Sequence, residues 1–350
     1  GSFNAALGYE SLKANTTGGQ NTGLGDRTLL ANTTGALNTA VGQGSLAANT
    51  TASNNVAVGV YALEANTTGA NNTAVGQAAL TDNTTGANNT AVGYLASRVI
   101  TTGSNNVSVG AGGNLGANTT GANNVAVGYA SLGGNTTASN NTAVGFDSLA
   151  ANTTGHSNVA MGLNALNDNT TASYNTSVGT YSMDKTTTGS NNTAVGYQAL
   201  ELNTTAYQNT AVGVTSLKST TTGADNTGVG FSALFANTTG YDNTAVGKSS
   251  LVANTTGATN TAVGSNALVA NTTGGANVAI GYQALDANTT GGTNTAVGKA
   301  AMTANTTGSQ NTAVGLSALN ANTTATQQTG MGYVALYNAT VQYINNYRQL

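Results

Sequence analysis

One motif returns along almost the whole chain at a fixed interval, and it limits the choice of fold more than any other feature. A glycine closes the motif NTAVG, and we take this glycine as position 0 of each copy. It stands at Gly8, Gly25, Gly42, Gly59, Gly76, Gly93, Gly110, Gly128, Gly145, Gly162, Gly179, Gly196, Gly213, Gly230, Gly247, Gly264, Gly281, Gly298, Gly315 and Gly332. The 20 copies follow one another every 17 residues, except that 18 residues separate Gly110 from Gly128. A short fixed period indicates a repeat architecture in which each unit stacks on its neighbours.

The repeat predicts an all-β fold, a parallel β-solenoid or β-roll of about 20 coils over residues 1–336. Seventeen residues are too few for a helical hairpin repeat of about 33 or more, and Thr, Asn and Gly are poor helix formers. One coil buries too few apolar side chains to offset the entropy of ordering its backbone, so stacking must supply the stability. The extra residue within GAGGNLG, residues 110–116, is interpreted as a one-residue bulge in a continuous ladder.

Two columns of large apolar residues are the expected core. Position −1 holds Val, Leu, Ile or Met in every copy, as in Val75 and Val92. Position +4, which is +5 in the 18-residue copy, holds Leu or Met, as in Leu63 and Leu80, with Ser97 as the exception. Because side chains alternate along a strand, the Thr or Val at position −3 is expected to point inward together with position −1.

Two columns of asparagine are expected to form side-chain ladders. Position −4 is Asn in nearly every copy, as in Asn72 and Asn89, and the NTT segment adds a second column at position +7, as in Asn83. Amides stacked at the strand spacing of about 4.8 Å can each donate to the next. NTTG also matches the acceptor motif for N-glycosylation, but stacked and hydrogen-bonded asparagines would be poorly available to a transferase.

Position −2 is restricted to Ala, Gly or Ser, as in Ala74, Ala91 and Ala245. This restriction predicts a closely packed face opposite the inward Val. We expect a neighbouring chain around a shared axis to cover it, and the opposite wall of the same coil is the alternative. Tyrosines that directly follow the glycine, including Tyr94, Tyr129, Tyr197 and Tyr282, are candidate surface contacts for a sugar or a protein. Residues 337–350 leave the pattern and are expected to form a cap or connector, with Val341, Ile344 and Tyr347 spaced as in a short helix.

Composition excludes several classes of function. Lys and Arg number 8 in 350 residues, too few for a nucleic-acid-binding stripe, and no run of 18 apolar residues could cross a membrane. The chain has no Cys, its single His156 has no repeated partner, and its 11 acidic residues are scattered, unlike the Asp of every repeat in calcium-binding solenoids. GAGGNLG lacks the Lys-Ser/Thr ending of a phosphate loop. We therefore expect no enzyme activity, cofactor or metal.

The segments NTAVGxxAL and NVAIGYQAL resemble the SVAIGxxS head repeats of the YadA-like trimeric autotransporter adhesins, although the repeat here is longer. The full unit NTAVGYQALxxNTTGxx more closely resembles the repeats of tail-fibre-like proteins, and the resemblance covers about residues 4–336. It implies a left-handed β-roll in which three chains associate side by side.

These features favour a non-enzymatic structural fibre protein, the shaft or stalk of a phage tail fibre or bacterial surface adhesin that mediates attachment. Such a protein would be extracellular, on a cell surface or on a virion, with itself and a surface glycan or protein receptor as partners. The alternatives are an extracellular filament that assembles head to tail and, from a different class, an ice-binding solenoid. Thr columns favour ice binding, but the adjacent Thr84 and Thr85 are expected to point in opposite directions. A lyase on a β-helix is disfavoured because no cleft of charged residues is apparent.

Overall fold

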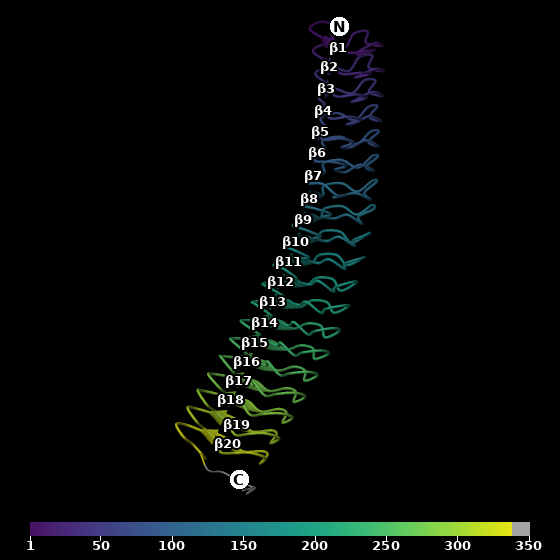
Figure 1. Cartoon of the computed structure of the whole chain (residues 1–350). Helices are drawn as coiled ribbons and strands as arrows, with labels where there is room; N and C mark the ends of the chain where they lie inside the picture. Colours follow the sequence, from purple (N-terminus) through teal and green to yellow (C-terminus); the bar gives the residue numbers. More distant parts are fainter. Residues whose placement is uncertain (338–350) are drawn as a thin grey trace, which may run out of the picture. The chain divides into compact units, whose positions relative to one another are not determined.

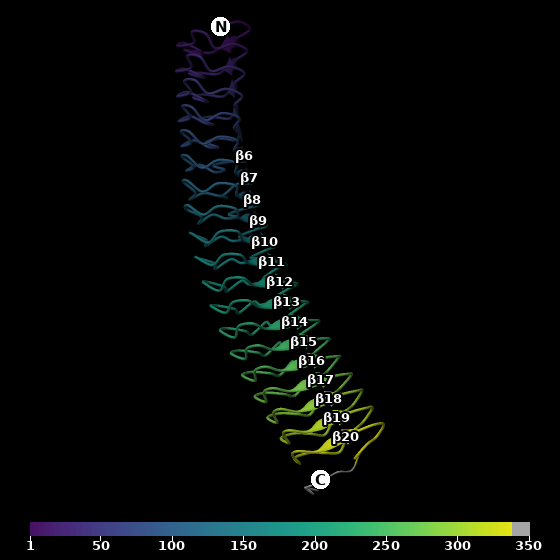
Figure 2. The same cartoon turned by 180° about the vertical axis from the view of Figure 1, so that it is seen from behind.

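Each 17-residue copy closes into one flattened coil, with a three-residue strand on one side and irregular turns on the other (Figure 1). The computed structural model describes residues 1–337 and contains no helix among them. The chain divides into two compact units, Gly1–Tyr181 and Ser182–Leu350, which are described here one at a time. Within each unit the coils are stacked in chain order, as the view from behind also shows (Figure 2).

The strands are short and uniform. Unit 1 contains β1 (Ala5–Leu7), β2 (Thr22–Leu24), β3 (Thr39–Val41), β4 (Val56–Val58), β5 (Thr73–Val75), β6 (Thr90–Val92), β7 (Val107–Val109), β8 (Val125–Val127), β9 (Thr142–Val144), β10 (Val159–Met161) and β11 (Thr176–Val178). Unit 2 contains β12 (Thr193–Val195), β13 (Thr210–Val212), β14 (Thr227–Val229), β15 (Thr244–Val246), β16 (Thr261–Val263), β17 (Val278–Ile280), β18 (Thr295–Val297), β19 (Thr312–Val314) and β20 (Thr329–Met331).

The predicted parallel β-solenoid is confirmed. Within each unit every strand pairs in parallel with the next, and equivalent residues face one another, so that Val75 lies opposite Val92. The register survives the 18-residue copy, because Val107 of β7 still pairs with Val125 of β8. The extra residue therefore lies in the turn after β7 and leaves the strand ladder intact.

The predicted direction of the strand side chains was wrong. Val75 and Val92 are each 37% exposed and point outward, and Thr73 and Thr90 at position −3 are partly exposed on the same side. The inward side chains are those of position −2, where Ala74 has no exposed surface. They share the interior with Leu63, Leu80 and the other residues of position +4, which are buried as expected except in the first and last described coils, where Leu12 is half-buried and Leu336 is exposed.

The coil is too thin for a valine to point inward from the strand. At Gly228, which replaces alanine at position −2, an added Cβ atom would lie 2.6 Å from Ser216 Oγ and 3.2 Å from Leu217 Cγ on the opposite wall. The opposite wall thus already touches the first carbon of the strand side chain. Leucine at position +4 fills the interior, and only Ala, Gly or Ser can face it.

Left-handed backbone conformations allow so short a loop to close. Non-glycine residues at positions −5, +2 and +4 have positive φ in nearly every described copy, with Leu80 at 51° and Asn71 at 60° as examples. The glycine of position 0 has φ near 135° in most copies, as at Gly76, a region open only to glycine. An added Cβ atom at Gly76 would also lie 2.3 Å from the carbonyl oxygen of Gly93. Position 0 is therefore glycine for two independent reasons.

The expected C-terminal cap or connector cannot be compared with the structure. Its first residue, Tyr337, is the last described residue, and the proposed helical positions Val341, Ile344 and Tyr347 lie outside the described part of the chain.

Candidate functional site

The outer face of the strands is the most extensive candidate surface. We define the outer face as the side chains at positions −3 and −1 of the strands. Position −1 stays apolar and at least partly exposed in every described coil, with Val58, Val75, Val92 and Val109 at 36–37% in unit 1 and Val195, Val212, Val246, Val263 and Ile280 at 36–41% in unit 2. Position −3 adds threonines, and valines such as Val56. Each unit therefore presents a continuous apolar file to its surroundings.

A column of mixed composition adjoins the outer face at position +1, where aromatic and aliphatic residues occur among polar and charged ones. The candidate contact residues Tyr94, Tyr129, Tyr197 and Tyr282 occur here and are 47–55% exposed, in keeping with a surface location. The Tyr129 ring stacks on Phe146 of the next coil, with ring centroids 5.3 Å apart and planes at 12°. These aromatic rings widen the exposed apolar surface at the end of the strand.

The candidate interface at position −2 is wrong. Ala74, Ala91 and Ala245 have no exposed surface in a single chain, because the opposite wall of their own coil covers them. The alternative that the small residues meet that wall is therefore the correct one. No partner chain can reach this column without opening the coil.

The asparagines at position −4 are fully or almost fully buried and link successive coils. The backbone amide of Asn89 donates to Asn72 Oδ1 at 2.8 Å. Asn72 Nδ2 then donates to the carbonyl oxygen of Gly86 at 2.8 Å. A backbone-to-side-chain bond thus joins the coils, and in some copies an amide-to-amide bond adds to it, as from Asn106 Nδ2 to Asn89 Oδ1 at 3.1 Å. The side chain also holds the corner of the coil.

The asparagines at position +7 form the amide-to-amide ladder. Asn83 Nδ2 donates to Asn66 Oδ1 at 2.9 Å and to the carbonyl oxygen of Gly86 at 3.0 Å. The carbonyl of Gly86 therefore accepts from both asparagine columns. Since Asn83 is buried, the NTTG motif is closed to a transferase in the folded chain.

Natural exceptions interrupt the ladder and show what it contributes. Ile100 replaces asparagine in unit 1, and Asn83 Oδ1 of the preceding coil has no hydrogen-bond partner. In unit 2, Thr186 partly substitutes, because Asn203 Nδ2 donates to Thr186 Oγ1 at 3.2 Å. Thr220 Oγ1 in the same column is buried without a partner.

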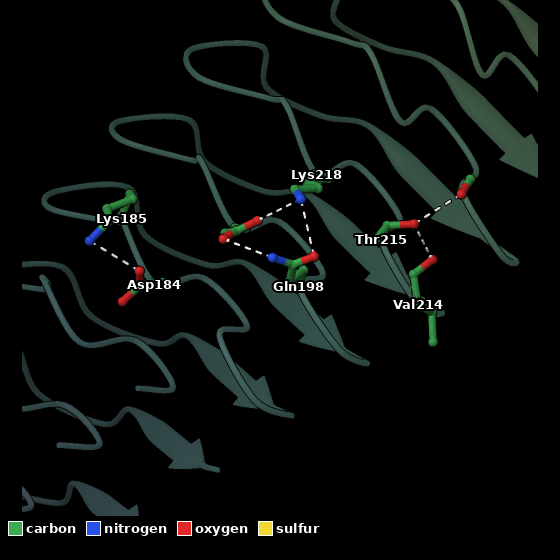
Figure 3. Close-up of polar contacts among 8 residues, drawn as sticks. Asp184, Lys185, Gln198, Val214, Thr215 and Lys218 are labelled. Carbon is green, nitrogen blue, oxygen red and sulfur yellow. Dashed lines mark hydrogen bonds and ion pairs between the residues drawn. The ribbon is translucent and has the colours of Figure 1, made fainter. Parts of the chain in front are cut away.

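Most charged side chains of the described residues lie at positions +2, +5 and +6; the others lie at position +1 (Asp26, Lys248, Lys299) and position −5 (Asp225, Asp242). In unit 2, Lys218 Nζ lies 3.2 Å from Glu201 Oε2 and donates to Gln198 Oε1 at 3.0 Å (Figure 3). In unit 1, Lys13 Nζ lies 2.6 Å from Glu10 Oε1. The hydrogen bond from Lys13 lowers the pKa of Glu10, and the nearby positive charge of Arg27 acts in the same direction. The contacts of Lys218 join neighbouring coils, whereas Lys13 and Glu10 lie in the same coil.

A grouping typical of a metal site is absent from residues 1–337. Within that range no three His, Cys, Asp or Glu side chains come together as a metal site would require. His156 stands at an exposed corner, where its ring meets the edge of Tyr174 at a centroid distance of 4.9 Å. No helix in the same range is long and apolar enough to cross a membrane. The comparisons add no assignment, since neither the protein-family models nor the curated proteins searched contain a match.

Proposed function

We propose that the chain is a non-enzymatic structural protein, the shaft of an extracellular fibre, whose copies associate side by side through the outer face. The observation that carries this proposal is the apolar file at position −1. Soluble monomers rarely expose an apolar patch larger than a few hundred Å², yet here valine, leucine, isoleucine or methionine recurs in every copy. The interior is already filled by Ala, Leu and Asn of the same coil, so the file has no structural role within one chain.

The chemistry of the outer face suits a second copy of the same chain. Its columns carry no charged residue in any of the 20 copies, so two outer faces can meet without burying an unpaired charge. The flat, periodic sheet also matches itself in spacing at about 4.8 Å per coil. The resemblance to the adhesin head repeats supplies the left-handed coil and the number three, and the tail-fibre-like repeats suggest a cell surface or virion as location.

The test is the mass of the assembled protein before and after charges are placed on the outer face. For the wild type we expect sedimentation equilibrium to give three times the chain mass of 34.2 kDa. Replacing Val58, Val75 and Val92 together by Glu should yield monomers, because three carboxylates would lose water in the contact. A wild-type protein that remains monomeric at every concentration would overturn the proposal.

The matched control changes the same three coils at another corner. Thr68, Thr85 and Thr102 at position +9 are exposed, and their replacement by Glu adds the same charge away from the outer face. This variant should keep the wild-type mass. Electron microscopy of the same samples separates the shaft from the head-to-tail filament, which would show long fibres instead of short particles.

Ice binding is a second candidate that the outward Thr column favours. Thr73, Thr90 and their equivalents stand on the flat outer face beside a file of valines, although Thr84 uses its hydroxyl in a bond to the carbonyl oxygen of Thr101. A thermal-hysteresis measurement on the monomeric glutamate variant and the wild type decides it. If the wild type is monomeric and shows thermal hysteresis, and the hysteresis is lost when glutamates are placed on the outer face, ice binding is the function and the shaft proposal is wrong.

A further inference from the structure

The 18-residue copy places its extra residue in an exposed glycine-rich turn. This turn runs from Gly110 to Leu115, and Ala111 and Gly112 are exposed. Gly112 and Gly113 have φ of 76° and 83°, and an added Cβ atom at Gly113 would meet nothing within 4 Å. The turn is therefore left-handed and open at Gly113, whereas an added Cβ atom at Gly112 would lie 2.1 Å from Tyr129 Cε2 of the next coil. The strands on either side keep their register.

The turn interrupts the backbone hydrogen bonds that join successive coils. Elsewhere in unit 1 the amide at position +2 donates to the carbonyl at +1 of the preceding coil, as Ala78 does to Val60 at 2.9 Å. Among the described residues of this unit beyond the first coil, Gly112 and Ala130 are the two whose amides lack this bond. The amide of Val99 likewise lacks the bond that Asp82 makes to Arg98 at 3.0 Å. Three links between coils are thus missing around one turn.

The interior is also weakest beside this turn. Ser97 replaces the leucine of position +4, and its buried Oγ has no hydrogen-bond partner. Ile100 replaces the asparagine of position +7 in the same coil and leaves Asn83 Oδ1 without a donor. The apolar column and the amide ladder therefore fail in the coil that directly precedes the inserted residue.

We propose that residues 97–116 form a built-in site of local opening, and that this site is where proteases first cleave the folded chain. A solenoid is held together by contacts between neighbouring coils, so it opens first where those contacts are fewest. A protease needs an exposed, extended segment, and exposed turns of small residues are the usual sites of nicking. The proposal does not depend on the proposed fibre function, because it concerns contacts within one chain.

Trypsin provides a direct test, since Arg98 lies in the coil that precedes the insertion. Lys218 occupies the same position +5 in a regular coil of unit 2 and is the internal comparison. Under native conditions we expect trypsin to cleave after Arg98 at least tenfold faster than after Lys218. Mass spectrometry of the fragments over time measures both cleavage rates. Cleavage after Arg98 no faster than after Lys218 would overturn the proposal.

A repaired variant separates local opening from the simple exposure of Arg98. Deleting Ala111 restores the 17-residue spacing, and Ser97→Leu with Ile100→Asn restores both interior columns. This variant retains Arg98, and its cleavage there should slow at least tenfold. An unchanged rate in a variant with wild-type circular dichroism would contradict the proposal.

The opposite variant creates the defect in a regular coil. One glycine inserted between Ser265 and Asn266 should remove the bond from the Asn266 amide to the Lys248 carbonyl, now 3.0 Å. Lys248 lies in the coil that precedes this insertion, as Arg98 precedes the natural one, although Lys248 is at position +1 and Arg98 at position +5. Trypsin should cut after Lys248 at least tenfold faster than in the wild type, and no acceleration would count against the proposal even if the repaired variant failed to fold.

Discussion

Removing one asparagine from the ladder at position +7 should destabilise unit 2 far more than its small change in volume suggests. Asn271 Nδ2 donates to Asn254 Oδ1 at 2.9 Å and to the carbonyl of Gly274 at 3.0 Å, and Asn271 Oδ1 accepts from Asn288 Nδ2 at 2.9 Å. Asn271→Ala removes all three bonds. If neighbouring asparagines could take over the hydrogen bonds of a lost one, the substitution would change the stability of the coils only slightly.

The expected loss of stability depends on which groups keep another hydrogen bond after Asn271 is removed and which are left without one. The carbonyl of Gly274 still accepts from Asn260 Nδ2 at 2.9 Å, and Asn288 Nδ2 still donates to the carbonyl of Gly291 at 3.0 Å. These two losses cost about 1 kcal/mol each, whereas Asn254 Oδ1 becomes a buried acceptor without a donor, at about 1–3 kcal/mol. We therefore expect about 4 kcal/mol in the free energy of opening the coils around Asn271.

Native-state hydrogen exchange measures this quantity coil by coil, which a single unfolding midpoint of a repeat protein does not. The amides of Thr255 and Thr272, which donate to the next coil at 2.9 Å each, are suitable reporters. Asn271→Thr is the graded comparison, because the chain itself carries Thr186 and Thr220 in this column, and it should cost less. Thr273→Ala, at the exposed position +9, is the control. A loss below 1 kcal/mol for Asn271→Ala would refute the reasoning.

Three further substitutions test the backbone and a carboxylate that burial partly removes from water. Gly281→Ala should prevent normal stacking of its coil, because φ is 137° and the added Cβ would lie 2.5 Å from the carbonyl oxygen of Gly298, whereas Gly275→Ala, at a position that holds alanine in other copies, should leave the thermal midpoint nearly unchanged. Thr259→Asn should stabilise by about 0.5–1 kcal/mol, since a β-branched residue is strained at φ 58° and asparagine tolerates that region; an unchanged or lower midpoint in thermal unfolding would contradict this. Burial raises the pKa of the Asp286 carboxyl, so its protonated form is favoured by folding and the stability it contributes at low pH is lost as pH rises through the folded pKa. Asp286→Asn should therefore stabilise at pH 7 but not at pH 3, and an equal effect at both pH values would show that desolvation of the charge is not the cause.

The sequence could predict the coil and its register because both follow from the period. A spacing of 17 residues puts Val75 against Val92 whatever the side chains do, and a parallel stack aligns the equivalent positions of all twenty copies. The buried leucines and the close packing of position −2 could also be anticipated, since only a tightly covered site excludes long polar side chains in every copy.

The side-chain direction could not be predicted from residue size. We expected the larger residue, Val75, to lie inside and the smaller one, Ala74, to face a partner, but the coil is so thin that the reverse holds. The strand is only three residues long, so alternation gives two equal choices, and the decision depends on the distance to the opposite wall. That distance depends on residues with left-handed backbone conformation, such as Leu80 with a φ of 51°. The conformational preference of leucine does not predict such a φ value.

The predicted contact surface was assigned to the wrong side of the strand for the same reason. Reversing the alternation moves the open face from Ala74 to Val75 while keeping it on the same strand. The tyrosines at position +1 were correctly expected at the surface, because a column that tolerates Gln, Lys, Asp and Tyr cannot be buried. Their stacking, as between Tyr129 and Phe146, depends on the closeness of successive coils and on chain direction at the turn.

The central claim is that a single chain closes its own interior and leaves the valine file for another copy, and thiol accessibility tests it most directly. The chain has no cysteine, so Ala74→Cys and Val75→Cys each introduce one reporter. In the assembled protein both should resist a maleimide. When Val58 and Val92 are also replaced by Glu to keep the chain monomeric, Ala74→Cys should stay protected and Val75→Cys should react readily. Equal, rapid labelling of Val75→Cys in both backgrounds would mean that no copy covers the outer face, and rapid labelling of Ala74→Cys would mean that the coil is not closed.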